Sequence, residues 1–441
     1  MATHGWLERA TAADPERVAV ETTAGSVVYR ELLERARGAA GALVGLGVRA
    51  GDRVAIALPA GLELAVAFHG CLLVGAVAQP IDLRLAGAER ERRAEGAAVV
   101  VEGPLAGGSP LDGSAVRDPD AVAVLLHTSG TTGAPRAVGL TYGNFERSAA
   151  GSAEVLGLDP EERWLCALPL AHVGGLSILV RSAIYGTTAV VHERFDAAAA
   201  TRAVMSEGVT LASLVPTTLA RMLDAGLERP PALRCALIGG APLPAPLARR
   251  ALEAGVPVAQ TYGMTEACSQ VATSAPGEPE TAGRPLPGTR VEIGADGEIL
   301  VSGPTVAPGV AGPDGRLHTG DLGRLDEHGR LTVTGRLSEL IVTGGENVAP
   351  AEVEAVLLAH AAVADAAVFG APDPEWGEAV TALVVPRDGA PVDPAALRAH
   401  CSAALAGYKV PKSFIAVATV PRTASGKILR GALAAAPTAT A

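Results

Sequence analysis

The feature that most constrains the fold is a set of short apolar runs, each of which stops in a glycine-rich or hydroxyl-rich turn. The runs are AVAVLLHTSG (121–130), CALIGGAP (235–242) and VPVAQTYG (256–263). Such runs are typical of strands that are buried on both faces of a parallel sheet. Segments at helical spacing, such as residues 28–47, alternate with strand-like segments, such as RVAIALP from Arg53. The sequence therefore predicts an α/β fold with ligand sites at the carboxyl ends of its strands.

The pattern changes after Gly283. VEIGADGEILVSG (291–303) and GRLDEHGRLTVTGR (323–336) each place two alternating strands around an Asp-Gly or His-Gly turn, which predicts antiparallel pairs. After Leu337, helix-like residues 351–360 and 394–405 flank strand-like segments, as in a small α+β unit.

We therefore expect an N-terminal domain over residues 1–336, built from parallel or mixed sheets and helices. It includes an antiparallel β subdomain at about residues 284–336. A small, mobile α+β domain is expected over residues 337–441. Residues 84–118 are rich in glycine, proline and charge, which indicates surface loops.

Composition excludes several classes of partner. A net charge of −11 and a pI near 5.4 argue against nucleic acid and anionic membranes, because proteins that bind these are basic. The chain is 49% hydrophobic but only 3% aromatic, so its cores must be mostly aliphatic. Small molecules or proteins are the expected partners.

The cysteines and the termini point to a protein of the cytoplasm. Five cysteines without C-x-x-C spacing predict neither a disulfide framework nor a zinc site. The first residues, MATHGWLERATAADPERVAV, carry acidic side chains and no apolar core of a signal peptide. We also expect no membrane insertion, because no apolar stretch approaches about 18 residues.

The densest polar segment is HTSGTTGAPR (127–136), which follows an apolar strand. Its glycines let the backbone approach an anion closely, and its hydroxyls and free amides are hydrogen-bond donors. The segment lacks the G-x-x-x-x-G-K-[ST] spacing of a Walker loop. Taken alone, it is either a polyphosphate-binding loop or an ordinary Gly/Thr turn.

The part TSGTTGAPR resembles the phosphate loop of the acyl-adenylate-forming superfamily, which comprises acyl-CoA synthetases, peptide-synthetase adenylation domains and beetle luciferases. Further motifs similar to those of the superfamily follow in its order and cover nearly the whole chain. They are TYGMTE (261–266), HTGD (318–321), Gly335-Arg336, GGEN (344–347) and PRTASGK (421–427). From this ordered set the chain is identified as a member of the acyl-CoA synthetase branch.

The resemblance implies ATP, Mg²⁺ and coenzyme A as ligands, together with a small-molecule carboxylate. The residues that it implies as catalytic are Lys427, Thr265, Glu266, His172 and Arg336, with Glu266 also the metal ligand. The residues that it implies as binding ATP or CoA are Thr128, Ser129, Gly130, Thr131, Thr132, Gly133, Arg136, Gly240, Ala241, Tyr262, Gly263, Asp321, Gly344, Gly345 and Glu346.

These residue types suit the chemistry. Attack of a carboxylate on the α-phosphate of ATP brings two anions together, so charge stabilisation matters more than covalent catalysis. Thr265 can donate to the α-phosphate, and Glu266 is a hard oxygen ligand for Mg²⁺. Asp321 can accept both ribose hydroxyls, and Lys427 is a compact charge able to contact two oxygens. Without the resemblance, Asp321 is interpreted as a turn residue and Glu266 as a charge at a helix N-terminus. Arg336 is then a surface ion pair and Lys427 a solvated lysine.

Two positions depart from the superfamily pattern. Arg136 stands where a lysine usually ends the phosphate loop, so the charge remains but its geometry differs. Because lysine occurs only at Lys409, Lys412 and Lys427, this arginine fits a general preference of the chain. Lys409 and Lys412 are surface charges that can meet CoA phosphates. Ser338 stands at the hinge, where Asp or Lys is common, and still permits rotation of the small domain.

The stretch from Leu168 to Gly186 bears on the identity of the acid. Ala171 stands where an aromatic residue usually precedes the histidine, which widens the acyl pocket. The run H-x-G-G-L-S-I-L-x-R-S-x-x-Y-G from His172, together with ACSQ (267–270), resembles the o-succinylbenzoate-CoA ligases of menaquinone synthesis. Their substrate is an aromatic dicarboxylate.

The second carboxylate of that acid needs a donor or a cation near the pocket. The polar candidates are His172, Ser177, Thr217 and Gln270. On structural grounds alone, His172 is a satisfied buried histidine and Arg181 is a charge on a helix surface.

The sequence leaves three functions open. The first is a two-step acid-CoA ligase, with o-succinylbenzoate or another aryl or acyl acid as substrate. The second is a free-standing adenylation enzyme that loads an acyl-carrier protein. The third is a degenerate nucleotide-binding protein, which Arg136 makes conceivable. A homodimer is a further possibility.

Overall fold

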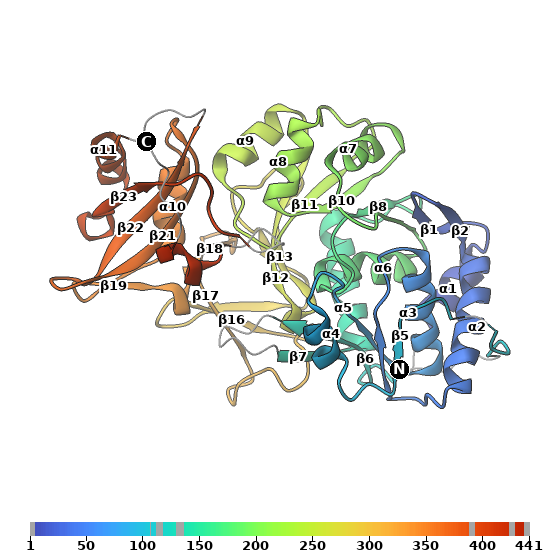
Figure 1. Cartoon of the computed structure of the whole chain (residues 1–441). Coiled ribbons are helices and arrows are strands. Elements are labelled where there is room, and N and C mark those ends of the chain that lie inside the picture. Colours follow the sequence, from blue (N-terminus) through green and yellow to red (C-terminus); the bar gives the residue numbers. More distant parts are fainter. Residues whose placement is uncertain are drawn as a thin grey trace.

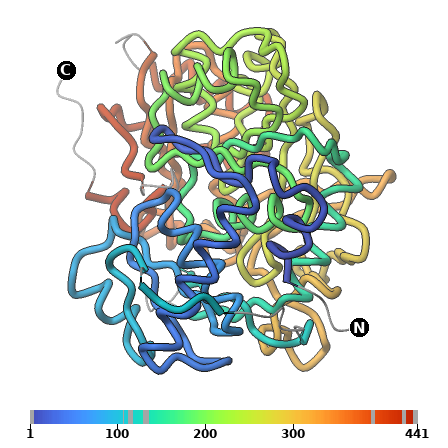
Figure 2. Tube along the Cα trace, turned by 90° about the vertical axis from the view of Figure 1, so that its right-hand side faces the viewer, coloured from blue at the N-terminus to red at the C-terminus, as the bar shows by residue number. Residues whose placement is uncertain are grey.

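The computed structural model describes residues 5–105, 107–111, 118–128, 136–387, 393–422 and 428–435. Within these residues the chain forms four β-sheets. Figure 1 shows the C-terminal elements beside the rest of the chain, and in Figure 2, turned by 90°, the N-terminal segments lie in front. None of the described helices has the length and apolar character that a membrane span requires.

A five-stranded sheet is formed by the N-terminal part of the chain, in the order β5-β3-β4-β6-β7. Its strands are β3 (Arg53–Ile56), β4 (Val77–Pro80), β5 (Val99–Val101), β6 (Val122–Thr128) and β7 (Arg136–Thr141). Strands β3 to β6 are parallel, and β7 returns antiparallel to β6. The carboxyl ends of β4 and β6 are therefore neighbours at one edge of the sheet.

A nine-stranded sheet has the order β14-β13-β12-β11-β10-β8-β9-β1-β2. Its strands are β1 (Val18–Thr22), β2 (Gly25–Val28), β8 (Arg163–Cys166), β9 (Thr188–Val191), β10 (Leu211–Leu214), β11 (Cys235–Ile238), β12 (Val258–Met264), β13 (Ser269–Thr273) and β14 (Arg284–Pro285). The strands from β1 to β12 in this order are parallel, and β2, β13 and β14 are antiparallel additions. The apolar runs of the sequence form β6, β11 and β12, as predicted.

Helices pack on both sheets. One apolar core joins the sheets through α1 (Trp6–Ala13), α2 (Tyr29–Gly45), α3 (Leu62–Val74), α5 (Tyr142–Leu156) and α6 (Val173–Tyr185). A second core lies between the nine-stranded sheet and α7 (Ala197–Ser206), α8 (Pro216–Asp224) and α9 (Ala245–Glu253).

Helix α3 is buried on nearly every side and contacts strands of both sheets. Ala36, Ala39 and Ala40 of α2 are fully buried beside it. A Cβ on Gly70 of α3 would lie only 2.9 Å from the Cβ of Ala39. Small residues thus let these helices approach closely, which explains a core that is aliphatic and poor in aromatic side chains.

The remaining sheets form the C-terminal part. The antiparallel sheet β15-β16-β17-β18 comprises β15 (Arg290–Ile293), β16 (Glu298–Ser302), β17 (Leu317–Leu325) and β18 (Leu331–Arg336). After the 3₁₀ turn η2 (Leu337–Glu339), a five-stranded sheet is built from β19 (Ile341–Thr343), β20 (Glu346–Val348), β21 (Val363–Asp373), β22 (Gly377–Pro386) and β23 (Ser413–Ala416). Helices α10 (Pro350–Leu358) and α11 (Pro394–Ala404) pack on it.

The expectation of loops over residues 84–118 was wrong in part. Helix α4 (Gly87–Ala94) and strand β5 lie in this segment. Helix α4 buries no residue, so its sequence lacks the periodic apolar face by which a helix is recognised. An ion pair between Glu89 and Arg93 at 2.9 Å supports it instead. Residues 106 and 112–117 of this segment lie outside the described residues.

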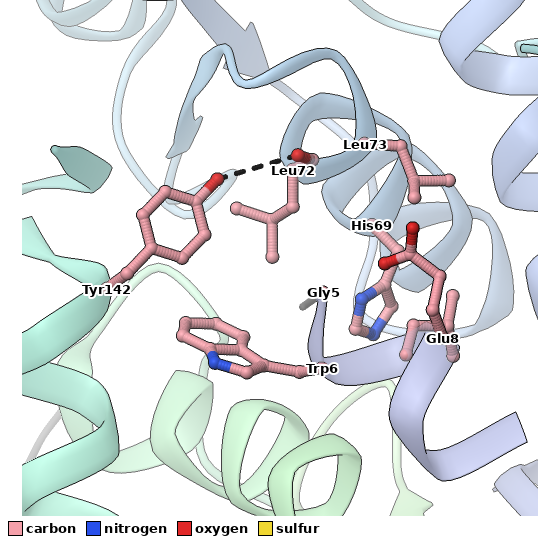
Figure 3. Close-up of a pocket in the computed structure, with 8 residues that line it drawn as sticks. Gly5, Trp6, Glu8, His69, Leu72, Leu73 and Tyr142 are labelled. Atoms are coloured by element: carbon pink, nitrogen blue, oxygen red, sulfur yellow. Dashed lines mark hydrogen bonds between the residues drawn. The ribbon is translucent and has the colours of Figure 1, made fainter. Parts of the chain in front are cut away.

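A small cavity lies between α1 and α3 (Figure 3). Its volume is about 10 Å³, so it holds one water molecule at most, and no residue of the predicted site lines it. His69 on α3 borders it and is 2% exposed, and its Nε2 has no hydrogen-bond partner among the described residues. Burial lowers the pKa of His69 to about 4, so the imidazole is neutral at pH 7.

We expect His69 to make the protein less stable in mild acid. The unfolded chain binds a proton at a pKa near 6.5, whereas the folded chain resists it until about pH 4, so stability falls as pH drops through this window. Between pH 7 and pH 5 the free energy of unfolding should fall by about 2 kcal/mol more in the wild type than in His69→Leu. Urea titration measures this difference, and an equal loss in both proteins would contradict the assignment.

Candidate active site

The polar residues of the nine-stranded sheet gather at one edge. Because β8, β10, β11 and β12 are parallel neighbours, the residues that follow them lie along the same edge. The 3₁₀ turn η1 (Thr265–Ala267) directly follows β12. The residues of the predicted site on this edge are His172 at the start of α6, Gly240 and Ala241 after β11, Tyr262 and Gly263 in β12, and Thr265 and Glu266 in η1.

The turn after Glu266 is strained. Cys268 has φ 52° and Ser269 has φ 88°, and such a conformation costs a non-glycine residue about 1–3 kcal/mol. Ser148 Oγ donates to the carbonyl of Cys268 at 2.7 Å and accepts from Arg181 Nη2 at 3.0 Å. These bonds hold the backbone that positions Glu266.

Arg181 does not fit the interpretation that rests on structural grounds alone. It is not a charge on the helix surface but is 3% exposed, and its guanidinium lies 5.7 Å from the ring centroid of Trp164. Burial lowers its pKa, and no carboxylate pairs with it among the described residues. The signal in the sequence was the apolar character of α6 around it, since a helix that is apolar on all sides is buried.

Asp321 lies in a doubly irregular part of β17. The register with β16 shifts between Glu298 and Leu300, and the register with β18 shifts between Leu322 and Gly323. Bulges of this kind redirect side chains at sites of function. Here they place the carboxylate of Asp321 beside residues from two other strands.

Two predicted residues contact that carboxylate. Tyr262 donates its hydroxyl to Asp321 Oδ2 at 2.8 Å, and Arg336 Nε lies 2.7 Å from Oδ1. The Nε–H of Arg336 is not aligned for a hydrogen bond, so this contact is an ion pair. Burial and the charge of Asp321 raise the pKa of Tyr262, which keeps the phenol protonated as a donor.

His172 lies in a charged cluster between the two parallel sheets. Its Nε2 is 3.2 Å from Asp82 Oδ2 and 3.1 Å from Arg84 Nη2, and both residues follow β4 of the other sheet. Arg84 also forms a two-pronged ion pair with Asp82 at 2.8 and 2.6 Å. Burial would raise the pKa of Asp82, but the hydrogen bonds from Arg84 and His172 outweigh it and lower this pKa.

The side chain of His172 is 49% exposed, so it is not a buried, satisfied histidine. Ser177 and Gln270 are buried, and the hydroxyl of Ser177 has no hydrogen-bond partner among the described residues. Sequence reasoning did not find Asp82 and Arg84, because neither belongs to a motif and their position beside His172 depends on how the sheets pack.

The candidate phosphate loop is the connection between antiparallel strands β6 and β7. Thr128 and Arg136 are register partners at its base, and Arg136 is exposed. The predicted residues Ser129, Gly130, Thr131, Thr132 and Gly133 lie outside the described residues. Since β6 neighbours β4, the base of the loop lies on the same edge as Asp82.

A second group of predicted site residues lies on the five-stranded sheet of β19 to β23, the C-terminal sheet. Gly344 and Gly345 form the turn between β19 and β20, and Glu346 begins β20. A Cβ on Gly344 would lie 2.9 Å from the indole of Trp376, so the glycine permits this contact. Lys412 Nζ lies 3.6 Å from the centroid of the same ring. Lys409 is instead paired with Glu352 at 2.7 Å.

Lys427 lies outside the described residues. Arg422 and Ile428, which flank residues 423–427, are paired by an antiparallel bridge. Arg422 also pairs with Asp365 of β21 at 2.7 Å.

Glu266 is suited to an ion that also contacts phosphates. No group of three or more His, Cys, Asp or Glu side chains is arranged as a metal cage among the described residues. Glu266 is partly exposed, and its carboxylate makes no hydrogen bond or ion pair with the described part of the chain. Mg²⁺ is typically bound by one or two carboxylates and substrate phosphates, so this residue fits it.

Comparison with protein families agrees with this geometry. The model of the AMP-binding enzyme family matches residues 7–102 and 101–310, and that of the AMP-binding enzyme C-terminal domain matches residues 352–427. The chain therefore belongs to the AMP-binding enzyme family.

Two relatives are similar over nearly the whole chain. The 2-succinylbenzoate–CoA ligase of Bacillus licheniformis is 40% identical, with 96% of this chain and 98% of the relative covered. The o-succinylbenzoate CoA synthetase of Bacillus subtilis, solved with its acyl-adenylate intermediate, has a TM-score of 0.91 at 37% identity, with both chains fully covered (100%).

Other complexes of the Bacillus subtilis enzyme also resemble this chain. The complex with ATP and magnesium ion has a TM-score of 0.89 at 37% identity, over 98% of this chain and 100% of that one. A double mutant bound to a CoA product analogue has a TM-score of 0.73 at 36% identity, over 99% of both chains.

Gly263 should tolerate no side chain. A Cβ at this position would lie 1.7 Å from the carbonyl oxygen of Ser269, a backbone atom of the strained turn. We expect Gly263→Ala to lower the free energy of unfolding by about 3 kcal/mol and to abolish ATP–pyrophosphate exchange. Gly38→Ala is the control, because no atom lies within 4 Å of that Cβ inside α2 and alanine should add about 0.5–1 kcal/mol. Wild-type stability and exchange in Gly263→Ala would be inconsistent with the close approach.

Proposed function

We propose that this protein is an ATP-dependent acid–CoA ligase that converts o-succinylbenzoate into o-succinylbenzoyl-CoA through an acyl-adenylate. The main support is the similarity over nearly the full length to ligases of this specificity, at 40% identity for the Bacillus licheniformis enzyme. The edge that carries Tyr262, Thr265 and Glu266 supplies the residue types that the reaction requires.

In the first step, an oxygen of the aliphatic carboxylate attacks the α-phosphorus of ATP, and the bond to the β-phosphate oxygen breaks to release pyrophosphate. Asp321 accepts the ribose hydroxyls and Thr265 donates to the α-phosphate. Mg²⁺, when held by Glu266, neutralises phosphate charge. Arg136 and Lys427 supply positive charge where the two anions meet.

In the second step, the CoA thiolate attacks the acyl carbon, and the carbon–oxygen bond to AMP breaks. The face formed by Gly344, Gly345 and Glu346 lies along the path of the pantetheine arm. Lys412 is a better contact for CoA phosphates than Lys409, because Lys409 is already paired with Glu352.

Residues 1–336 and 337–441 act as the two moving units, with the hinge at Ser338 in η2. The difference between the TM-scores of 0.91 and 0.73 for two complexes of one relative supports such a motion, because both comparisons cover at least 99% of this chain. The higher TM-score with the acyl-adenylate complex supports an arrangement in this chain like that of the first step.

The second carboxylate of the acid is bound near His172. Among the polar candidates, Ser177 fits best, because its buried hydroxyl has no partner among the described residues.

The cytoplasm is the proposed compartment, since all five cysteines are free and buried. A homodimer stays a prediction that light scattering would test.

The function is tested by AMP release over a panel of acids with and without CoA. We expect o-succinylbenzoate to exceed 4-oxo-4-phenylbutanoate, which lacks the ring carboxylate, and simple benzoates by at least about 100-fold in kcat/KM. Fatty acids and amino acids should be inactive, and o-succinylbenzoyl-CoA should form. Equal rates with benzoates would reject the acid, and adenylate formation without a CoA thioester would favour a carrier protein as acceptor.

Lys427→Arg should cripple the first step although it keeps the charge. A guanidinium is bulkier and planar and cannot replace a compact ammonium between two oxygens, so we expect at least about 100-fold slower adenylate formation. Thioester formation from preformed acyl-adenylate should change little. Lys412→Arg is the matched control and should adenylate normally. Near-normal AMP formation by Lys427→Arg would refute the role.

A further inference from the structure

Residues 318–321 lie in the bulged part of β17, and we call them the Asp321 turn because the backbone bends at Gly320. One buried carboxylate of the neighbouring strand β16 holds this turn. Glu298 on β16 is 8% exposed. Its Oε1 accepts the backbone N–H of Gly320 at 2.8 Å, and its Oε2 lies 2.8 Å from His318 Nδ1. One side chain thus holds two of the three residues that precede Asp321. Strands β16 and β17 lie side by side in Figure 1.

Further hydrogen bonds fix the backbone of the Asp321 turn, and they require the bend at Gly320. Gly320 has φ 69°, a left-handed conformation that favours glycine. The hydroxyl of Thr319 donates to the carbonyl of Ile299 at 2.7 Å and accepts from the N–H of Asp321 at 3.0 Å. The position of the Asp321 carboxylate therefore follows from how the turn is anchored to β16.

Charged side chains lie around Glu298 on the solvent-exposed side of the sheet. His318 is half-exposed, and its Nε2 lies 3.3 Å from Asp314 Oδ2. Hydrogen bonds with Glu298 and then Asp314 raise the pKa of His318 and favour the imidazolium. Arg316 pairs with Asp314 at 2.7 Å and lies 3.4 Å from Glu292 of β15. Glu298 alone among these carboxylates bonds to the turn backbone within the described residues.

We propose that Glu298 is a positioning residue for ribose recognition: it fixes the Gly320–Asp321 turn so that the Asp321 carboxylate meets both ribose hydroxyls. This inference rests on the proposed role of Asp321. A buried carboxylate that accepts an N–H is held more strongly than a neutral acceptor, and its loss leaves the Gly320 amide without that partner. Without this hydrogen bond, the backbone at Gly320 can move, and the Asp321 carboxylate is no longer held in one position.

The decisive experiment compares ATP with 2′-deoxy-ATP in the adenylation half-reaction. The wild type should prefer ATP in kcat/KM. Glu298→Ala should raise KM for ATP about tenfold or more and reduce the preference over 2′-deoxy-ATP at least about fivefold. KM for o-succinylbenzoate and for CoA should change less than about twofold, because neither site depends on the turn.

Two further variants keep the test sharp. Glu292→Ala removes the same charge from the neighbouring strand but touches no part of the turn, so its nucleotide preference should equal that of the wild type. Glu298→Asp keeps the charge but is one methylene too short to hold both Gly320 and His318, so it should lose part of the preference even if the alanine variant does not fold.

The outcomes separate the two proposals. A wild type that makes o-succinylbenzoyl-CoA but does not distinguish the nucleotides overturns the role of Asp321 and, with it, that of Glu298. A wild type that distinguishes them, with folded Glu298 variants that distinguish them equally well, overturns the role of Glu298 alone. An equal loss of preference in Glu292→Ala would show a general charge effect and also overturn it. Failure to make the thioester rejects the proposed function without bearing on ribose preference.

Discussion

Burial of helix α3 between the two parallel sheets is the constraint on which the rest of the structure depends. The helix is apolar on nearly all sides, so neither sheet alone can cover it. Covering it from both sides brings the strand ends of the two sheets together. The contact of His172, which follows β8, with Asp82, which follows β4, is the direct result. The site is therefore a product of core packing as much as of its own motifs.

The antiparallel sheet β15–β18 contributes the residues around Asp321 to the strand ends of the nine-stranded sheet. Asp321 and Arg336 are cross-strand partners of β17 and β18, and Tyr262 reaches the same carboxylate from β12. A carboxylate held between a cation and a phenol is already oriented before a nucleotide arrives. Such preorganisation removes part of the reorganisation that binding would otherwise require.

Sequence patterns predicted what depends on local order. The apolar runs gave the strands β11 and β12, and the change after Gly283 gave the antiparallel sheet, because strand period and turn residues are local properties. Long-range packing could not be read in the same way. Arg181 and Asp82 acquire their surroundings from residues far away in the chain, and α4 has no buried face that a periodic pattern would reveal. The roles of the motif residues came from resemblance, not from spacing.

The indole of Trp376 has an optical consequence. The chain contains three tryptophans, and the other two, Trp6 and Trp164, are 3% and 1% exposed in the apolar core that joins the two large sheets. Trp376 is partly exposed between the Gly344 turn and the ammonium group of Lys412. Intrinsic fluorescence therefore combines the signals of two indoles shielded from solvent with one signal that senses the surroundings of the Gly344 turn. The protein contains its own spectroscopic reporter on the face of the C-terminal sheet.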